Sequence, residues 1–301
     1  MHKKITLLSA LLLVISLAAG AQQRGAHASA PATAQGDIET QENVLYATVK
    51  GTELHLDVYE PSNRGMQTGP AVVLIHGGAW SSFDKSTMSR MGQFLARSGF
   101  VAFAVDYRLL KGDENRWPAQ LDDVQRAVRW IRANAGKYGV DPDHIGAFGH
   151  SAGAQLAALL GMEDTRDNSD RALAKYSSRV QAVVDVSGPT DFTTMKDPEG
   201  VELLTSFLGA EYSKHPEIWE EASPAFHVSK KDAPFLIVHG TKDDSVPIAQ
   251  AQELYDKLHA ARVPVSFLKV DDVHTFENPE NKRTMALEAR DFFFKYLAGS
   301  Q

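Results

Sequence analysis

Ser151 is the residue whose surroundings most favour nucleophilic chemistry. It stands at the centre of Gly149-His150-Ser151-Ala152-Gly153, after the apolar run 145–148 and before the helix-forming run 155–160. A strand, a sharp turn and a helix are what a G-x-S-x-G nucleophile elbow needs, because the glycines leave room where Cβ atoms would collide. The hydroxyl then lies at a helix start, where free N–H groups favour a developing oxyanion. The alternative is a serine that only caps the helix.

A second, independent signal lies upstream of the serine, and it is needed because the five-residue pattern alone also arises by chance. Residues 70–75 form an apolar run typical of a buried strand, and this run leads directly into the His-Gly-Gly turn at 76–78. An oxyanion hole takes one N–H from the residue after the nucleophile, here Ala152, and one from such an upstream turn, here Gly77 or Gly78. We expect His76 to shape this turn rather than to carry protons.

A nucleophilic serine also needs a base and a group that orients the base. In one common chain order the serine is followed by the acid and then by the histidine. Residues 234–240 are typical of a buried strand that ends in a turn, and Asp243 and Asp244 follow, so either carboxylate is placed to serve as the acid. Of the two histidines further on, His259 falls within a helical pattern on the expected surface. His274 follows a predicted strand in a loop, which is where the base should lie.

Predicted strands and helices alternate along the rest of the chain. Residues 44–50 and 53–59 form a predicted hairpin, 100–106 and 180–187 are predicted strands, and a helix begins at Pro118. Alternating β and α elements indicate an α/β fold with a mainly parallel sheet covered on both faces. Such sheets bind ligands beyond the carboxyl ends of their strands, which is where the candidate serine, acid and histidine fall.

Residues 192–231 interrupt the alternation, and a connection of this length usually marks a lid or insertion. We expect a short helical cap over the site that forms part of the pocket; the alternative is a packed helical excursion that never touches substrate. Trp80 and His150 are further candidate pocket residues. The large apolar side chains of the insertion are Leu203, Leu204, Phe207, Leu208, Trp219 and Phe226.

From about Val44 to its C-terminus the chain resembles α/β-hydrolases of the acetyl esterase and carboxylesterase group, which are related to the hormone-sensitive lipase, feruloyl esterase and arylformamidase branches. The resemblance implies the α/β-hydrolase fold, with a mainly parallel eight-stranded sheet, helices on both faces and a short helical lid insertion. Besides the elbow, the segments that carry it are 76–80, 106–108, 117–118, 122–124, 188–191, 222–224 and 239–243.

The resemblance also implies roles for individual residues. The acid of the family is the aspartate four residues after the histidine of the His-Gly-Thr turn, which places it at Asp243 rather than Asp244. The implied enzyme is a serine esterase for short-chain acyl esters with the catalytic residues Ser151, His274 and Asp243. Ala79 departs from the pattern, since many relatives have a third glycine there, and this leaves the shape of the nearby pocket open.

Alternatives remain at the level of substrate. A feruloyl or acetylxylan esterase acting on plant polysaccharide would use the same residues, and so would an arylformamidase-like amidase. A hydrolase fold reused as a non-catalytic binding module would be expected to have lost part of the Ser, Asp and His set, whereas all three are present here. The expected partner is a small-molecule or polysaccharide-linked ester, and the oligomeric state is not readable from the chain.

Composition narrows the class further. The 301 residues contain no cysteine, which excludes disulfides and thiol chemistry, and the formal net charge of −7 argues against nucleic-acid binding. The sequence has no spaced His, Asp or Glu cluster and no phosphate-cradling glycine loop, so we expect neither a metal nor a cofactor.

The N-terminus predicts export. Residues 1–21 have a basic start, an apolar run too short to span a bilayer comfortably and an Ala-Gly-Ala cleavage site, which together are typical of a signal peptide. Its removal takes away Lys3 and Lys4 and changes the net charge from −7 to −9. We expect a secreted or periplasmic protein without a stable membrane anchor, the alternative being a retained anchor. Residues 22–41 should then be a flexible leader and 42–301 the α/β-hydrolase domain.

Overall fold

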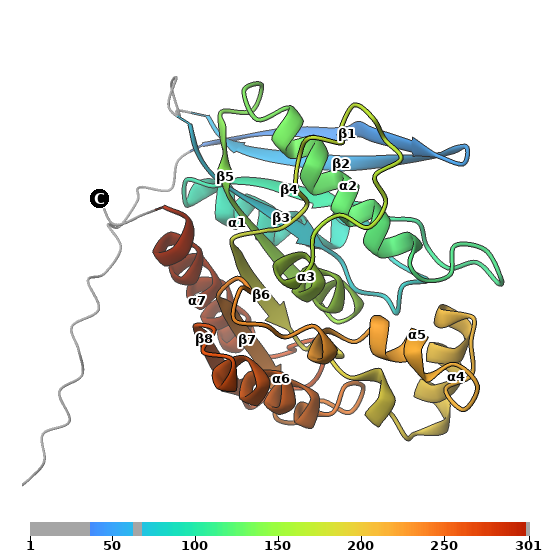
Figure 1. The fold of residues 1–301 in the computed structure, drawn as a ribbon. Helices are drawn as coiled ribbons and strands as arrows, with labels where there is room; N and C mark the ends of the chain where they lie inside the picture. The colour runs from blue at the N-terminus through green and yellow to red at the C-terminus, as the bar shows by residue number, and fades with distance from the viewer. Residues whose placement is uncertain (1–36, 63–67, 299–301) are drawn as a thin grey trace, which may run out of the picture. The chain divides into compact units, whose positions relative to one another are not determined.

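Eight strands of the described chain form one sheet in the order β1-β2-β4-β3-β5-β6-β7-β8 (Figure 1). The computed structural model describes residues 37–62 and 68–298, which belong to one compact unit. β1 pairs with β2 and β2 with β4 in antiparallel fashion, and every other neighbouring pair is parallel. The predicted mainly parallel, eight-stranded sheet is therefore confirmed. The strands are β1 (Ile38–Val49), β2 (Thr52–Pro61), β3 (Gly69–Ile75), β4 (Val101–Val105), β5 (Val140–His150), β6 (Ala182–Val186), β7 (Phe235–Gly240) and β8 (Val265–Val270).

Helices cover both faces of this sheet, as the alternation predicts (Figure 1). Side chains of α2, α3 and α6 pack on one face, and those of α1 and α7 pack on the other. Every residue of β4 and β6 is consequently buried, which is why these strands are continuous apolar runs rather than alternating ones. The helices are α1 (Ser89–Arg97), α2 (Ala119–Ala133), α3 (Ala152–Met162), α4 (Pro198–Leu208), α5 (Pro216–Glu221), α6 (Ile248–Ala260) and α7 (Pro279–Leu297).

The first strand begins earlier than the sequence predicts. β1 starts at Ile38, so residues 38–41 of the predicted leader 22–41 belong to the sheet, where they pair with β2. Glu39, Thr40 and Gln41 are polar and give no strand pattern, because an edge strand is held by backbone hydrogen bonds and needs little buried surface to form. The predicted signal peptide and residues 22–36 of the predicted leader lie outside the described residues.

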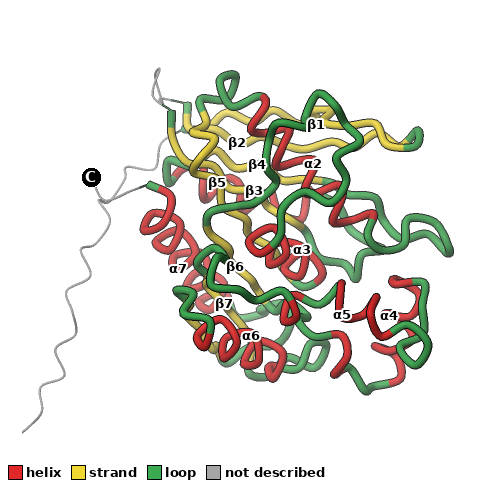
Figure 2. Tube along the Cα trace, in the orientation of Figure 1, coloured by secondary structure: helices red, strands yellow, loops and turns green. Residues whose placement is uncertain are grey.

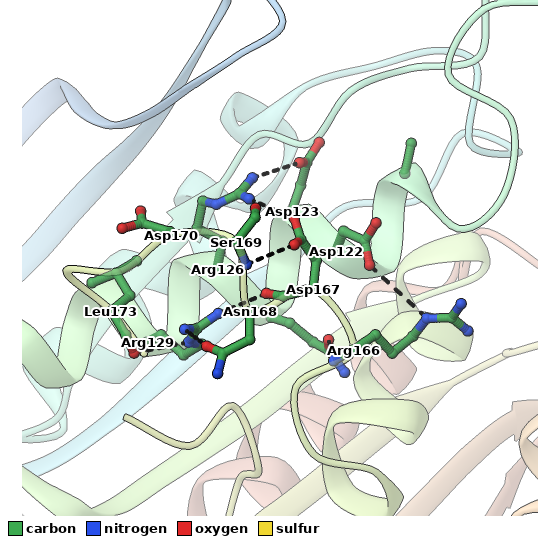
Figure 3. Close-up of polar contacts among 12 residues, drawn as sticks. Asp122, Asp123, Arg126, Arg129, Arg166, Asp167, Asn168, Ser169, Asp170 and Leu173 are labelled. Carbon is green, nitrogen blue, oxygen red and sulfur yellow. Dashed lines mark hydrogen bonds and ion pairs between the residues drawn. The ribbon is translucent and has the colours of Figure 1, made fainter. Parts of the chain in front are cut away.

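A long connection without regular structure, residues 163–181, is held against α2 by buried arginines (Figure 3). Arg129 is 1% exposed, and it donates to the carbonyl oxygens of Leu173 and Asp167 and to Asn168 Oδ1. Arg126 bonds Asp167 Oδ2 at 2.9 Å. The guanidinium group of Arg129 thus satisfies backbone oxygens that regular secondary structure would otherwise satisfy, and that of Arg126 adds a side-chain ion pair.

The predicted insertion 192–231 consists of α4, α5 and two 3-10 turns at Phe192–Thr194 and Pro224–Phe226. Figure 2 shows α4 and α5 lying to one side of the sheet and the helices that cover it. The insertion is tied to the segment that follows α3 by two ion pairs, His227 with Glu163 at 2.7 Å and Glu221 with Arg166. Among the described residues, no helix is long and apolar enough to cross a membrane.

Candidate active site

Ser151 lies in a strained turn between β5 and α3, as the elbow pattern predicts. Its φ of 55° is in the left-handed region, and its backbone N–H donates to Val186 O at 2.9 Å. A Cβ at Gly149 would lie 2.1 Å from Gly153 O, and one at Gly153 would lie 2.2 Å from Ile75 O. Only glycine fits at either position, and this crowding holds the serine at the tip of the turn.

The structure brings Ser151, His274 and Asp243 into one hydrogen-bonded chain. His274 comes from the loop between β8 and α7; its Nε2 lies 2.9 Å from Ser151 Oγ, and its Nδ1 lies 2.7 Å from Asp243 Oδ2. The carboxylate can only accept, so Nδ1 carries the proton and Nε2 accepts from the serine hydroxyl. Ser151 makes no side-chain cap to α3. Asp244 is exposed and its carboxylate bonds Ser245 instead, so Asp243 is the aspartate beside the imidazole.

The side chain of Asp243 is fully buried yet well supplied with donors. Its Oδ1 accepts from the backbone N–H groups of Ser245 and Val246, at 3.0 and 2.8 Å, and His239 Nε2 lies 3.1 Å from Oδ2. Burial alone would raise the pKa of Asp243, but the hydrogen bonds from His239, His274 and Val246 outweigh it and hold this pKa well below its ordinary range. The carboxylate is therefore charged at neutral pH. His239 was not singled out from the sequence, although it stands in the turn that precedes Asp243.

The glycine turn after β3 lies directly against the elbow. A Cβ at Gly77 would come within 2.9 Å of His150 O and 3.1 Å of Ser151 Cβ, and Gly78 has a φ of 105° that favours glycine. Within the described residues, the backbone N–H groups of Gly77, Gly78 and Ala152 make no backbone hydrogen bond. They remain free to donate to an oxyanion formed at the serine.

Residues on either side of these glycines give the turn its shape. His76 Nδ1 lies 2.7 Å from Gly77 O, its ring stacks on Tyr107 at 4.3 Å, and burial lowers its pKa. A neutral, stacked imidazole of this kind fits the expected shaping role. Ala79 has a φ of 51°, so alanine here adopts a left-handed conformation that favours glycine.

A cavity of about 530 Å³ opens above Ser151, a size suited to a small ligand. Met195, Leu203 and Leu204 of the insertion line it, so the insertion forms part of the pocket wall as expected. Phe83, 65% exposed, lines it as well. No lining residue is an aspartate, glutamate, lysine or arginine. Among the described residues, no cluster of three or more histidines, aspartates or glutamates is arranged to hold a metal ion.

Trp80 and His150, the two candidate pocket residues, both line this cavity. Trp80 stacks on Phe207 of the insertion at 4.1 Å and donates from Nε1 to Gln155 Oε1 at 3.1 Å. Burial lowers the pKa of His150, and its Nε2 lies 3.0 Å from His274 O. His150 thus forms part of the cavity wall and also contacts the backbone of the loop that carries His274. This contact joins residues 124 positions apart, so the sequence spacing does not reveal it.

The fold and this site define an α/β-hydrolase, in which a serine at an elbow faces a histidine and a carboxylate from later strand ends. The chain belongs to the BD-FAE family, whose model matches residues 56–258.

Proteins of similar sequence are named as esterases, which is consistent with this class. Esterase LipC of Mycobacterium tuberculosis is 31% identical over 241 residues, covering 76% of this chain and 58% of its own length. The probable carboxylic ester hydrolase LipM of the same organism is 31% identical over 227 residues, covering 73% of this chain and 52% of its own length. The chain therefore spans about half the length of the curated relatives it matches.

Solved structures share the fold over nearly their whole length. A truncated carbohydrate esterase from gut microbiota has a TM-score of 0.74 and 28% identity, covering 87% of this chain and 97% of its own. The native form of a thermophilic esterase from Thermogutta terrifontis has a TM-score of 0.72 and 25% identity. The match covers 90% of this chain and 96% of the esterase chain.

Replacing Gly149 by alanine should lower the free energy of unfolding by about 2–4 kcal/mol, because the new Cβ overlaps Gly153 O and the turn must open. Gly136→Ala is the matched control: nothing lies within 4 Å of its Cβ position, and the change should be within about 0.5 kcal/mol of neutral or stabilising. Urea unfolding of both variants measures the difference. Equal stabilities would show that the crowding does not hold the elbow.

Proposed function

We propose that this protein is a serine carboxylic ester hydrolase that works through an acyl-enzyme. The observation that carries the proposal is the hydrogen-bonded chain from Ser151 Oγ through His274 to Asp243, with free backbone N–H groups at Ala152 and in the glycine turn against the elbow. The names of LipC and LipM, an esterase and a probable carboxylic ester hydrolase, support it.

In the proposed reaction Ser151 Oγ attacks the ester carbonyl carbon while His274 Nε2 takes the hydroxyl proton. The tetrahedral oxyanion accepts hydrogen bonds from Ala152 N–H and from Gly77 or Gly78 N–H. The imidazolium returns the proton to the leaving alcohol, which leaves the acyl group on the serine. Water, activated by the same imidazole, then releases the acid and restores the hydroxyl.

Asp243 has an orienting role in this scheme. Its carboxylate holds the Nδ1–H tautomer of His274 and stabilises the imidazolium that forms after proton transfer. The depressed pKa of Asp243 keeps the carboxylate charged on the acid side of neutrality, and the scheme needs an imidazole that can accept the serine proton. Activity should therefore fall as the pH is lowered, without a separate loss caused by protonation of Asp243.

The substrate we propose is a neutral ester with a short acyl group. The absence of charged side chains from the cavity lining supports a neutral substrate, and the insertion residues that close one side of the cavity support a short acyl chain. A second candidate is an acyl ester on plant polysaccharide. It is favoured by the likeness to a carbohydrate esterase and by the exposed ring of Phe83 at the cavity, where a sugar ring can stack.

We also propose that the protein is exported to the periplasm or the medium. The support is the sequence of residues 1–21 alone, with its basic start, short apolar run and small-residue cleavage site. Mass spectrometry of the mature chain from a periplasmic or culture fraction should give an N-terminus at Gln22. An intact N-terminus on a membrane-associated chain would support the retained anchor instead.

Ser151→Ala should reduce ester hydrolysis by several orders of magnitude while the protein stays folded, because the hydroxyl supplies the nucleophile. Asp243→Asn should also be severe, since the amide presents the wrong hydrogen-bonding group to Nδ1. Asp244→Asn is the matched control and should stay near wild type, as this carboxylate is exposed. Turnover of p-nitrophenyl acetate measures all three, and near-wild-type turnover by Ser151→Ala would refute the serine mechanism.

Specificity for p-nitrophenyl esters should peak between acetyl and butyryl and fall steeply by octanoyl. Each added methylene gains up to about 0.8 kcal/mol while the cavity accepts it and clashes once the insertion blocks it. The measurement is kcat/KM across the acyl series, with acetylated xylan assayed in parallel for the polysaccharide candidate. A kcat/KM that keeps rising to dodecanoyl would indicate a lipase with an open cleft.

A further inference from the structure

A second imidazole contacts the carboxylate of Asp243 on the side away from His274. His239, at the end of β7, is 0% exposed, and its Nε2 lies 2.8 Å from Val246 O and 3.1 Å from Asp243 Oδ2. Both of these atoms are acceptors, so Nε2 carries the proton and donates. Asp243 Oδ2 therefore lies between two imidazoles, with His274 on the side of the cavity and His239 on the side of the core.

Other polar groups are buried at the same end of the sheet. Asp185 pairs with Ile237 on the neighbouring strand, so alternation along β6 and β7 places Asp185 and His239 on one face, and Ser187 follows directly after β6. Asp185 Oδ2, Ser187 Oγ and His239 Nδ1 are buried, and none has a hydrogen-bond partner among the described residues. None of these three residues lines the cavity. Unpartnered buried polar atoms are costly, and such groups are generally retained where they serve a function.

We propose that His239 is a positioning residue, which holds the Asp243 carboxylate in line with His274 through its Nε2–H. This inference rests on the function proposed above. Asp243 Oδ1 is fixed by two backbone N–H groups, and Oδ2 is shared by the two imidazoles. Without the donor at His239, Oδ2 would keep only its bond to His274, and the carboxylate would be held against rotation by the two bonds to Oδ1 alone.

His239 also affects the charge on Asp243. Burial raises the pKa of this carboxyl and the hydrogen bond from His239 lowers it, so loss of the donor should raise it. The other titratable groups that act on this region are Asp185, whose pKa burial raises to about 6, and the imidazoles of His150 and His274. A higher pKa of Asp243 brings protonation of this carboxylate closer to the acid limb of the pH profile, so the limb should move upward in a variant without the donor.

The test compares two amides at one position. In His239→Gln the side-chain NH₂ reaches the place of Nε2 and can still donate to Asp243, whereas in His239→Asn the shorter amide reaches only the place of Nδ1. With p-nitrophenyl acetate, His239→Asn should lower kcat about 10- to 100-fold, which is what a hydrogen bond to a charged group contributes. Its KM should stay within about twofold because His239 does not line the cavity. His239→Gln should keep kcat within about fivefold and leave the acid limb in place.

The pH profile of kcat/KM separates positioning from a structural role. The acid limb of His239→Asn should lie about 0.5 pH unit or more above that of wild type, and Asp185→Asn, which removes the neighbouring titratable carboxyl, should leave the limb in place. Thermal melts check folding, and if His239→Asn does not fold, His239→Met replaces it as the variant without a donor. Equal kcat and an unshifted limb in the Gln and donor-free variants would overturn the inference. Absence of activity in wild type, or activity in Ser151→Ala, would instead refute the proposed function.

Discussion

The backbone turn at Ser151 is the constraint on which the site depends. Its positive φ is sustained because the chain on both sides approaches other backbone too closely for any side chain, at Gly149 against Gly153 and at Gly153 against Ile75. The same approach brings the glycine turn after β3 to the elbow, where Gly77 packs on Ser151. The nucleophile and the free N–H groups are thus placed by one packing arrangement between adjacent parallel strands.

The sequence predicts most of this arrangement because the relevant signals are local. The elbow pattern at Ser151 predicts a strand, a turn and a helix, and each apolar run that ends in a turn predicts a buried strand and the position of its end. In a parallel sheet these strand ends lie at one edge. Asp243 and His274 could be placed for the same reason. The structure confirms the eight-stranded sheet with helices on both faces, and it brings together the residues proposed for catalysis.

What the sequence does not reveal depends on contacts between distant segments. In the sequence, His239 is only a residue near the end of a predicted strand, and the fold is needed to show that its ring contacts the carboxylate of Asp243. The contact of His150 with the backbone of His274 joins positions 124 residues apart. The polar start of β1 carries no periodicity, because an edge strand pairs through its backbone and buries little. Arg129, which would be read as a surface residue, is buried against carbonyl oxygens of a segment that has no pattern of its own.

The uncharged cavity also affects how the proposed reaction ends. Hydrolysis converts a neutral ester into a carboxylic acid, which is ionised at neutral pH. The lining has no lysine or arginine to retain the resulting anion, and the carboxylate of Asp243 behind His274 has the sign that repels it. Departure of the acid is then favoured over its return to the serine. Product inhibition by the acid should therefore be weak and re-esterification of the released acid inefficient, so the uncharged cavity favours hydrolysis over its reverse.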